Sequence, residues 1–153
     1  MSHDTWVALH VLGVVVFLGN LVVTAVWKTL ADRTRDASVI AYAQRLVTIT
    51  DISFTATGVA LITVSGFALA DDWGGITGPS WLTVGVTLFA AAGLIWLTIL
   101  IPTQIEQTCL TRRFAPTGAI PDRYWRLARR WYVFGALATL LPLANIFVMA
   151  LKP

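Results

Sequence analysis

The stretch WVALHVLGVVVFLGNLVVTAVW, residues 6–27, contains no Asp, Glu, Lys or Arg. An α-helix rises ~1.5 Å per residue, so this stretch is long enough to cross the ~30 Å hydrocarbon core of a bilayer. No Lys or Arg precedes it and the apolar run is longer than a typical signal-peptide core, so we interpret it as a retained helix. The stretch therefore predicts the first of several membrane-spanning helices.

Three further apolar segments follow, at residues 51–70, 81–101 and 131–151. Only 12% of the chain is charged, against about 25% in soluble domains. The apolar runs are continuous rather than alternating, which favours helices over a β-barrel. The sequence predicts an all-α fold in which residues 1–153 form a single domain, a four-transmembrane-helix bundle that includes the span at residues 6–27.

Positive charge is concentrated at two of the three connections between the spans. The second connection, residues 70–80, carries Asp71 and Asp72 and neither Lys nor Arg. Cytoplasmic connections are enriched in Lys and Arg, so we predict an antiparallel bundle with both termini outside the cytoplasm. These basic residues lie beside anionic lipid headgroups, which argues against a nucleic-acid partner. Ten of the eleven basic residues flank the first and third connections: Lys28, Arg33, Arg35, Arg45, Arg112, Arg113, Arg123, Arg126, Arg129 and Arg130.

The two basic connections have structure of their own. Asp36 or Ser38 can cap a helix, and apolar residues at helical spacing over residues 39–46 extend helix two into the cytoplasm. In the third connection Pro102 is expected to end its span. After a polar stretch, Asp122 can cap a short basic, amphipathic helix, which we expect to lie on the inner leaflet before helix four.

Polar residues inside the spans are costly in hydrocarbon and usually face the bundle interior. Lys28 and Asp51 fall at similar depth near the cytoplasmic boundary, which predicts an ion pair between helices one and two. A proton or ion relay is the alternative role for this pair. Thr139 lies near Asn20 in depth, which predicts a hydrogen bond between helices four and one. The residues expected in this polar interior are Asn20, Thr24, Lys28, Asp51, Thr139 and Asn145.

One pair of residues could bind a cofactor. His10 lies about one turn below the outer surface, and Met149 is at comparable depth on helix four. An imidazole and a thioether can together hold the iron of haem b, or a soft metal. The alternative is that His10 is a packing residue that donates to a neighbouring carbonyl. The chain contains no phosphate loop, zinc motif or serine elbow.

Several strings give the chain a family resemblance: GNLVVTAVWK at 19–28, QRLVTITD at 44–51, GLIWLTILIPTQ at 93–104 and ATLLPLANIFVMALKP at 138–153. With these strings it resembles a family of small predicted bacterial integral membrane proteins, domain of unknown function 2269. That resemblance covers nearly the whole chain and implies a four-helix inner-membrane protein. More distantly, the Leu9-His10 pair resembles the first helix of copper-resistance membrane proteins and of the haem-dependent protoporphyrinogen oxidase. This second resemblance implies that His10 is a haem ligand.

Three classes of function remain open. The first is a non-enzymatic accessory or assembly factor, because no motif in the chain requires catalysis. The second is a haem-binding or redox membrane protein that uses His10. The third is a small transporter, which we expect to be a homodimer because four helices enclose little volume. The expected partners are the lipid bilayer and either a second copy of the chain or another membrane protein.

Overall fold

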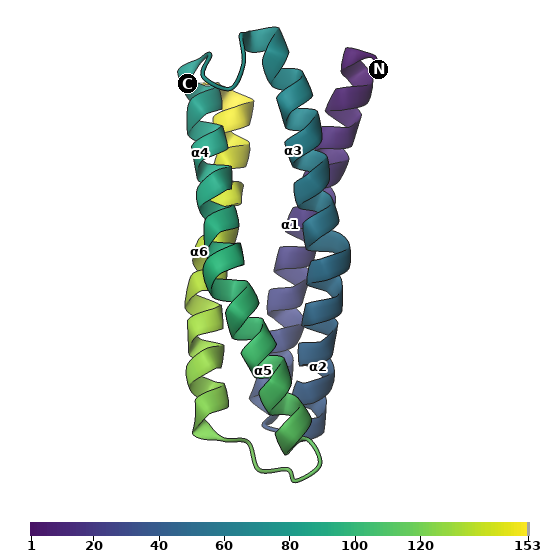
Figure 1. Ribbon diagram of the computed structural model, residues 1–153, viewed down its shortest axis with the longest axis vertical. Coiled ribbons are helices and arrows are strands. Elements are labelled where there is room, and N and C mark those ends of the chain that lie inside the picture. Colours follow the sequence, from purple (N-terminus) through teal and green to yellow (C-terminus); the bar gives the residue numbers. More distant parts are fainter. Residues whose placement is uncertain (153) are drawn as a thin grey trace.

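The computed structural model describes residues 1–152, and all its regular structure is helical. Figure 1 shows a long bundle with the two chain termini at the same end. Four continuous helical segments are long and apolar enough to cross a membrane. The prediction of an all-α protein with four candidate spans is therefore confirmed. These segments are His3–Thr34, Ala37–Trp73, Ser80–Phe114 and Asp122–Leu151.

Two of the four segments are interrupted by a π-helical turn. In the second segment Ala56 N–H donates to the Asp51 carbonyl, and in the third Ile101 N–H donates to the Trp96 carbonyl. Each π-turn therefore joins two α-helices into one continuous segment. The elements in chain order are α1 His3–Thr34, α2 Ala37–Thr50, the π-turn Asp51–Thr55, α3 Ala56–Ala70, a 3-10 turn Asp71–Trp73, α4 Ser80–Ile95, the π-turn Trp96–Leu100, α5 Ile101–Phe114 and α6 Asp122–Leu151.

The start of α2 is fixed by a side-chain cap. Asp36 Oδ1 accepts hydrogen bonds from the backbone N–H groups of Ser38 and Val39 and from the Ser38 hydroxyl. The Ser38 hydroxyl and these two N–H groups hold the pKa of Asp36 below its ordinary value. Arg35 adopts a left-handed conformation with φ of 55°, which reverses the chain between α1 and α2. Of the two predicted N-cap candidates, Asp36 and Ser38, the structure therefore shows Asp36 in that role.

The sequence predicts that the segment after Pro102 is a polar connection, but the structure differs. It is helical as far as Phe114. Proline has no N–H to donate, but local π-helical adjustments re-satisfy the freed backbone groups in membrane helices. Here the π-turn Trp96–Leu100 immediately precedes the proline-containing turn. The helix therefore passes Pro102 instead of ending there.

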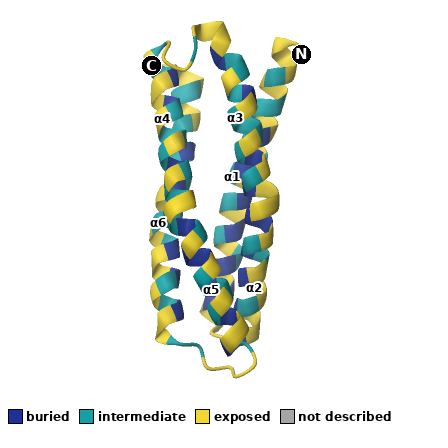
Figure 2. Cartoon of the chain, viewed as in Figure 1, coloured by how far each residue is buried: buried dark blue, intermediate teal, exposed yellow. Residues whose placement is uncertain are grey.

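The prediction of a separate short helix on the inner leaflet also differs from the structure. Residues after Asp122 belong to one continuous helix, α6, that runs to Leu151. The apolar side of its first turns is buried against the bundle, because Tyr124 and Ala128 pack in a cluster with Ile40 of α2 and Phe114 of α5. The extended ends of α2 and α5 thus provide the apolar surface that the sequence analysis assigned to the lipid. Buried residues are accordingly frequent around α2 and α5 (Figure 2).

The helices associate most extensively as two pairs, α1 with α3 and α4 with α6. Glycines bring the backbones of the first pair into contact. A Cβ built on Gly58 of α3 would lie 2.9 Å from the backbone nitrogen of Phe17 and 3.0 Å from the carbonyl oxygen of Gly13, both on α1. Small residues at helix interfaces permit such close approach in membranes. The α1–α3 pair is therefore tightly packed.

We predict that Gly58→Ala destabilises the bundle, because its methyl group must displace backbone atoms of α1. Overpacking of this kind costs about 1–3 kcal/mol, which outweighs the gain in helix propensity. Thermal unfolding in detergent, followed by circular dichroism, measures the effect. Gly19→Ala on α1 is the matched control, since a Cβ there meets no heavy atom within 4 Å. Equal melting temperatures for the two variants would contradict the close packing.

Candidate functional site

The Asp51 carboxylate lies inside the bundle where three helical segments meet. Its Oδ2 accepts a hydrogen bond from Gln104 Nε2 of α5 at 2.6 Å, and its Oδ1 accepts one from Asn20 Nδ2 of α1 at 3.2 Å. Oδ1 also accepts from the Thr55 hydroxyl at 3.1 Å. Asn20 is itself fixed, because it donates to Thr55 Oγ1 at 2.8 Å and accepts from the Thr24 hydroxyl at 3.2 Å. We call these five side chains the Asp51 network.

The Asp51 network contains a carboxylate without a cationic partner. Asp51 is only 7% exposed, and none of the ion pairs formed among residues 1–152 includes it. The side chains that donate to its oxygens are neutral, so they suit an ionised carboxylate but do not cancel its charge. An ionisable residue within a membrane span is by default a candidate for function. Asp51 is therefore the centre of the candidate site.

A cavity of about 520 Å³ lies beside this network, between the α1–α3 pair and the α4–α6 pair. Asp51 and Gln104 form part of its wall, and most of the other lining residues are apolar. Val22, Val26 and Leu140 also line it, and each is about half exposed. The cavity therefore opens between α1 and α6 on the surface that faces the membrane.

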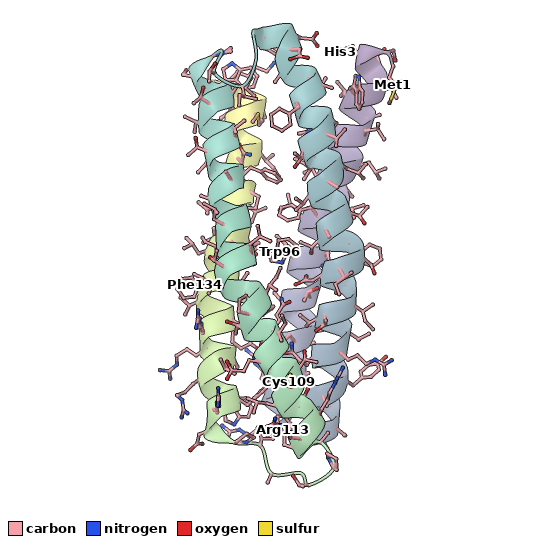
Figure 3. The ribbon with its side chains drawn as sticks, in the orientation of Figure 1. Met1, His3, Trp96, Cys109, Arg113 and Phe134 are labelled. Atoms are coloured by element: carbon pink, nitrogen blue, oxygen red, sulfur yellow. The ribbon has the colours of Figure 1, made fainter. Side chains whose placement is uncertain are left out.

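Aromatic side chains form much of the cavity wall. Phe17 and Phe89 meet edge to face with ring centroids 6.2 Å apart. Trp96 lies midway along the bundle, between the helix pairs (Figure 3). The indole Nε1 atoms of Trp96 and Trp131 are buried without a hydrogen-bond partner among the described residues. The cavity thus combines a largely apolar surface with one carboxylate. Its aromatic residues are Phe17, Phe89, Trp96, Trp131 and Tyr132.

The predicted ion pair between Lys28 and Asp51 is not formed, because Lys28 belongs to a second polar cluster. Lys28 Nζ lies 3.4 Å from Asp32 Oδ2 and donates to the Tyr124 hydroxyl at 3.0 Å. Asp32 in turn accepts from the hydroxyls of Tyr124 at 2.6 Å and Tyr132 at 2.7 Å. Lys28 and Asp32 are one helical turn apart, so the pair forms within α1 and needs no second helix. We call Lys28, Asp32, Tyr124 and Tyr132 the Lys28 cluster.

Two other residues of the predicted polar interior are placed on α6. The Thr139 hydroxyl donates to the Gly135 carbonyl of its own helix at 2.8 Å, so it does not form the predicted hydrogen bond with Asn20. Asn145 Nδ2 donates to the Gly85 carbonyl at 3.1 Å and so links α6 to α4. Of these two residues, Thr139 lines the cavity and Asn145 does not.

The two residues considered as haem ligands contact different helices. His10 Nδ1 lies 3.1 Å from Ser65 Oγ on α3, and that hydroxyl donates its proton to the Leu61 carbonyl. The imidazole is therefore the donor to Ser65. Met149 packs against Gly85 of α4, where its side chain occupies the space a Cβ would take. The structure brings each residue to a neighbouring helix, and nothing in it joins the two in one site.

The polar face of α5 was not predicted from the sequence. Thr103, Gln107 and Thr111 are no more than 2% exposed, and Gln104 is 6% exposed. Their spacing of three or four residues is visible in the sequence, but Pro102 and the polar residues that follow it are typical of a connection. Asp32 could also have been found, because it lies four residues after Lys28 on the same helix face.

Comparison with known proteins assigns the chain to a family. A family model described as "Predicted integral membrane protein (DUF2269)" matches residues 5–153, and the chain belongs to that family of integral membrane proteins. No curated protein and no solved structure matches it. The likeness to copper-resistance proteins and to the haem-dependent oxidase remains a prediction.

We predict that Lys28→Met destabilises the protein by about 3 kcal/mol, because it leaves Asp32 as a buried charge without its cation. A double-mutant cycle with Asp32→Asn should yield a coupling energy of at least ~1 kcal/mol. The same cycle with Asp51→Asn should yield a coupling energy near zero. Unfolding titrations in mixed detergent measure both. Stronger coupling of Lys28 to Asp51 than to Asp32 would contradict the observed pairing.

Proposed function

We propose that this integral membrane protein is a small carrier that binds a hydrophobic small molecule in the cavity between its two helix pairs. The observation that carries the proposal is the cavity of about 520 Å³ inside the membrane-spanning part of the bundle. Ligand sites in proteins commonly measure about 300–1,000 Å³ and combine apolar walls with a few polar groups. This cavity has that composition.

The position of the cavity supports uptake from the lipid phase. Its rim between α1 and α6 includes half-exposed valine and leucine side chains, so a hydrophobic molecule can enter from the membrane without first crossing water. The cavity is also formed by one chain, so binding does not require the homodimer considered for a transporter. A second copy remains compatible with the proposal.

The division into helix pairs supports movement of the ligand. The α1–α3 pair is joined by backbone contact at glycines, whereas the cavity separates it from the α4–α6 pair. Transporters commonly move one bundle of helices against another around a central site. The π-turns at Asp51–Thr55 and Trp96–Leu100 contribute Asp51 and Trp96 to the cavity, and such turns are frequent at functional sites.

We propose further that the helices run antiparallel in a bacterial inner membrane, with both termini outside the cytoplasm. The support is the basic charge near the α1–α2 and α5–α6 connections. Single cysteines replacing Thr77 and Thr117 in a Cys109→Ser background test the orientation. An impermeant maleimide should label the cysteine at 77 in intact spheroplasts and the one at 117 only after lysis. The reverse pattern would overturn the orientation.

Cavity-filling variants test the proposed function. Gly93 and Gly135 line the cavity, and a Cβ on either meets no heavy atom within 4 Å. Gly93→Leu combined with Gly135→Leu should therefore occupy the cavity without straining the backbone. We expect the double variant to bind the neutral probe N-phenyl-1-naphthylamine at least tenfold more weakly than the unmodified protein. Probe fluorescence in nanodiscs, corrected for empty nanodiscs, measures binding.

The matched control is Gly19→Leu, which adds the same side chain at an exposed position of α1 outside the cavity. It should bind the probe with unchanged affinity. If the double variant also binds with unchanged affinity while it remains folded, the cavity is not a binding site for hydrophobic molecules.

A further inference from the structure

We infer that the ligand of the cavity is a lipophilic organic cation and that the Asp51 carboxylate is its counter-ion. This inference rests on the proposed function and adds the charge of the ligand to it. The geometry behind it is the position of Asp51, whose buried carboxylate lies in the wall of an otherwise largely apolar cavity.

The bundle interior holds one carboxyl group that has no counter-ion among the described residues. The ammonium group of Lys28 and the carboxylate of Asp32 form a buried ion pair that is further bonded by two tyrosine hydroxyls. Asp51 has no corresponding cation among the described residues. A buried charge without a partner is costly, and a cation brought by the ligand removes that cost.

The hydrogen bonds around Asp51 hold the carboxylate ready for a cation. Gln104 occupies Oδ2, and Asn20 and Thr55 occupy Oδ1. A carboxylate has about four lone-pair directions, two on each oxygen, so Oδ2 retains capacity for one further partner. The neutral donors orient the group from α1, from its own helix and from α5, which leaves the attraction to a positive charge uncompensated.

The walls of the cavity favour a cation with an apolar body. Aromatic rings attract cations to their faces, and the attraction strengthens when water is excluded. Phe17, Phe89, Trp96, Trp131 and Tyr132 all line the cavity. A metal ion would need several ligating side chains, and no group of three or more His, Cys, Asp or Glu residues in the described chain could hold one. The combination fits an organic cation better than a metal ion.

The test compares two ions of the same shape and opposite charge. Tetraphenylphosphonium and tetraphenylborate are titrated by calorimetry into the full chain in nanodiscs of zwitterionic lipid, with empty nanodiscs subtracted. We expect the protein to bind the phosphonium at least tenfold more tightly than the borate. Asp51→Asn should reduce phosphonium affinity at least tenfold and abolish the preference for phosphonium over borate. Asp71→Asn, at an exposed carboxylate in the α3–α4 connection, is the matched control and should bind like the unmodified protein.

Asp51→Glu keeps the charge and should retain the preference for phosphonium, so the comparison does not depend on the folding of Asp51→Asn. Equal binding of both ions would overturn the inference. If the variant Gly93→Leu with Gly135→Leu then binds neither ion, the proposed carrier function still holds, and the cavity recognises its ligand by shape and not by charge. If neither ion nor the neutral probe binds, the proposed function fails as well.

Discussion

The arrangement of this bundle depends on one constraint, the need to hold a carboxylate inside a membrane-spanning helix. An unsatisfied polar group in hydrocarbon costs several kcal/mol, so Asp51 must find donors within the protein. It obtains them from Asn20 on α1, Thr55 on its own helix and Gln104 on α5. These three bonds fix the relative positions of segments that are distant in sequence.

The bundle is also uneven along its length. Toward the α5–α6 connection, the ends of α2, α5 and α6 bury Ile40, Phe114 and Tyr124 in one cluster, and the Lys28 cluster joins α1 to α6. Closer to the termini, the contacts are dominated by the separate α1–α3 and α4–α6 pairs. The cavity lies where the two arrangements meet, with Asp51 at its wall. A firmly joined end and a divided end suit a protein whose helix pairs move relative to each other.

The four spans could be predicted from the sequence, because a long, continuous apolar segment crosses a bilayer as an α-helix. It also indicated which polar residues of the first two spans would be buried: Asn20, Thr24, Lys28 and Asp51 are all less than 9% exposed. Their partners could not be derived in the same way. Depth alone matched Lys28 with Asp51, whereas a residue one turn away on α1, Asp32, was closer.

The remaining differences have a common physical origin. Pro102 and the charged residues after it suggested a connection, but a π-turn and the burial of Gln107 and Thr111 allow the helix to continue. The π-turns could not be predicted from a residue pattern, since a π-turn inserts one extra residue into an otherwise regular helix. The cavity is a property of how four helices pack, so periodicity along one chain does not reveal it.

The most direct test of the account is the infrared difference spectrum of the reconstituted protein with and without tetraphenylphosphonium, beside the same difference for Asp51→Asn. We expect the bound state to show an ionised carboxylate whose bands are absent from the Asp51→Asn spectrum. A protonated Asp51 carboxyl group in the phosphonium complex, or carboxylate bands that persist in Asp51→Asn, would contradict it.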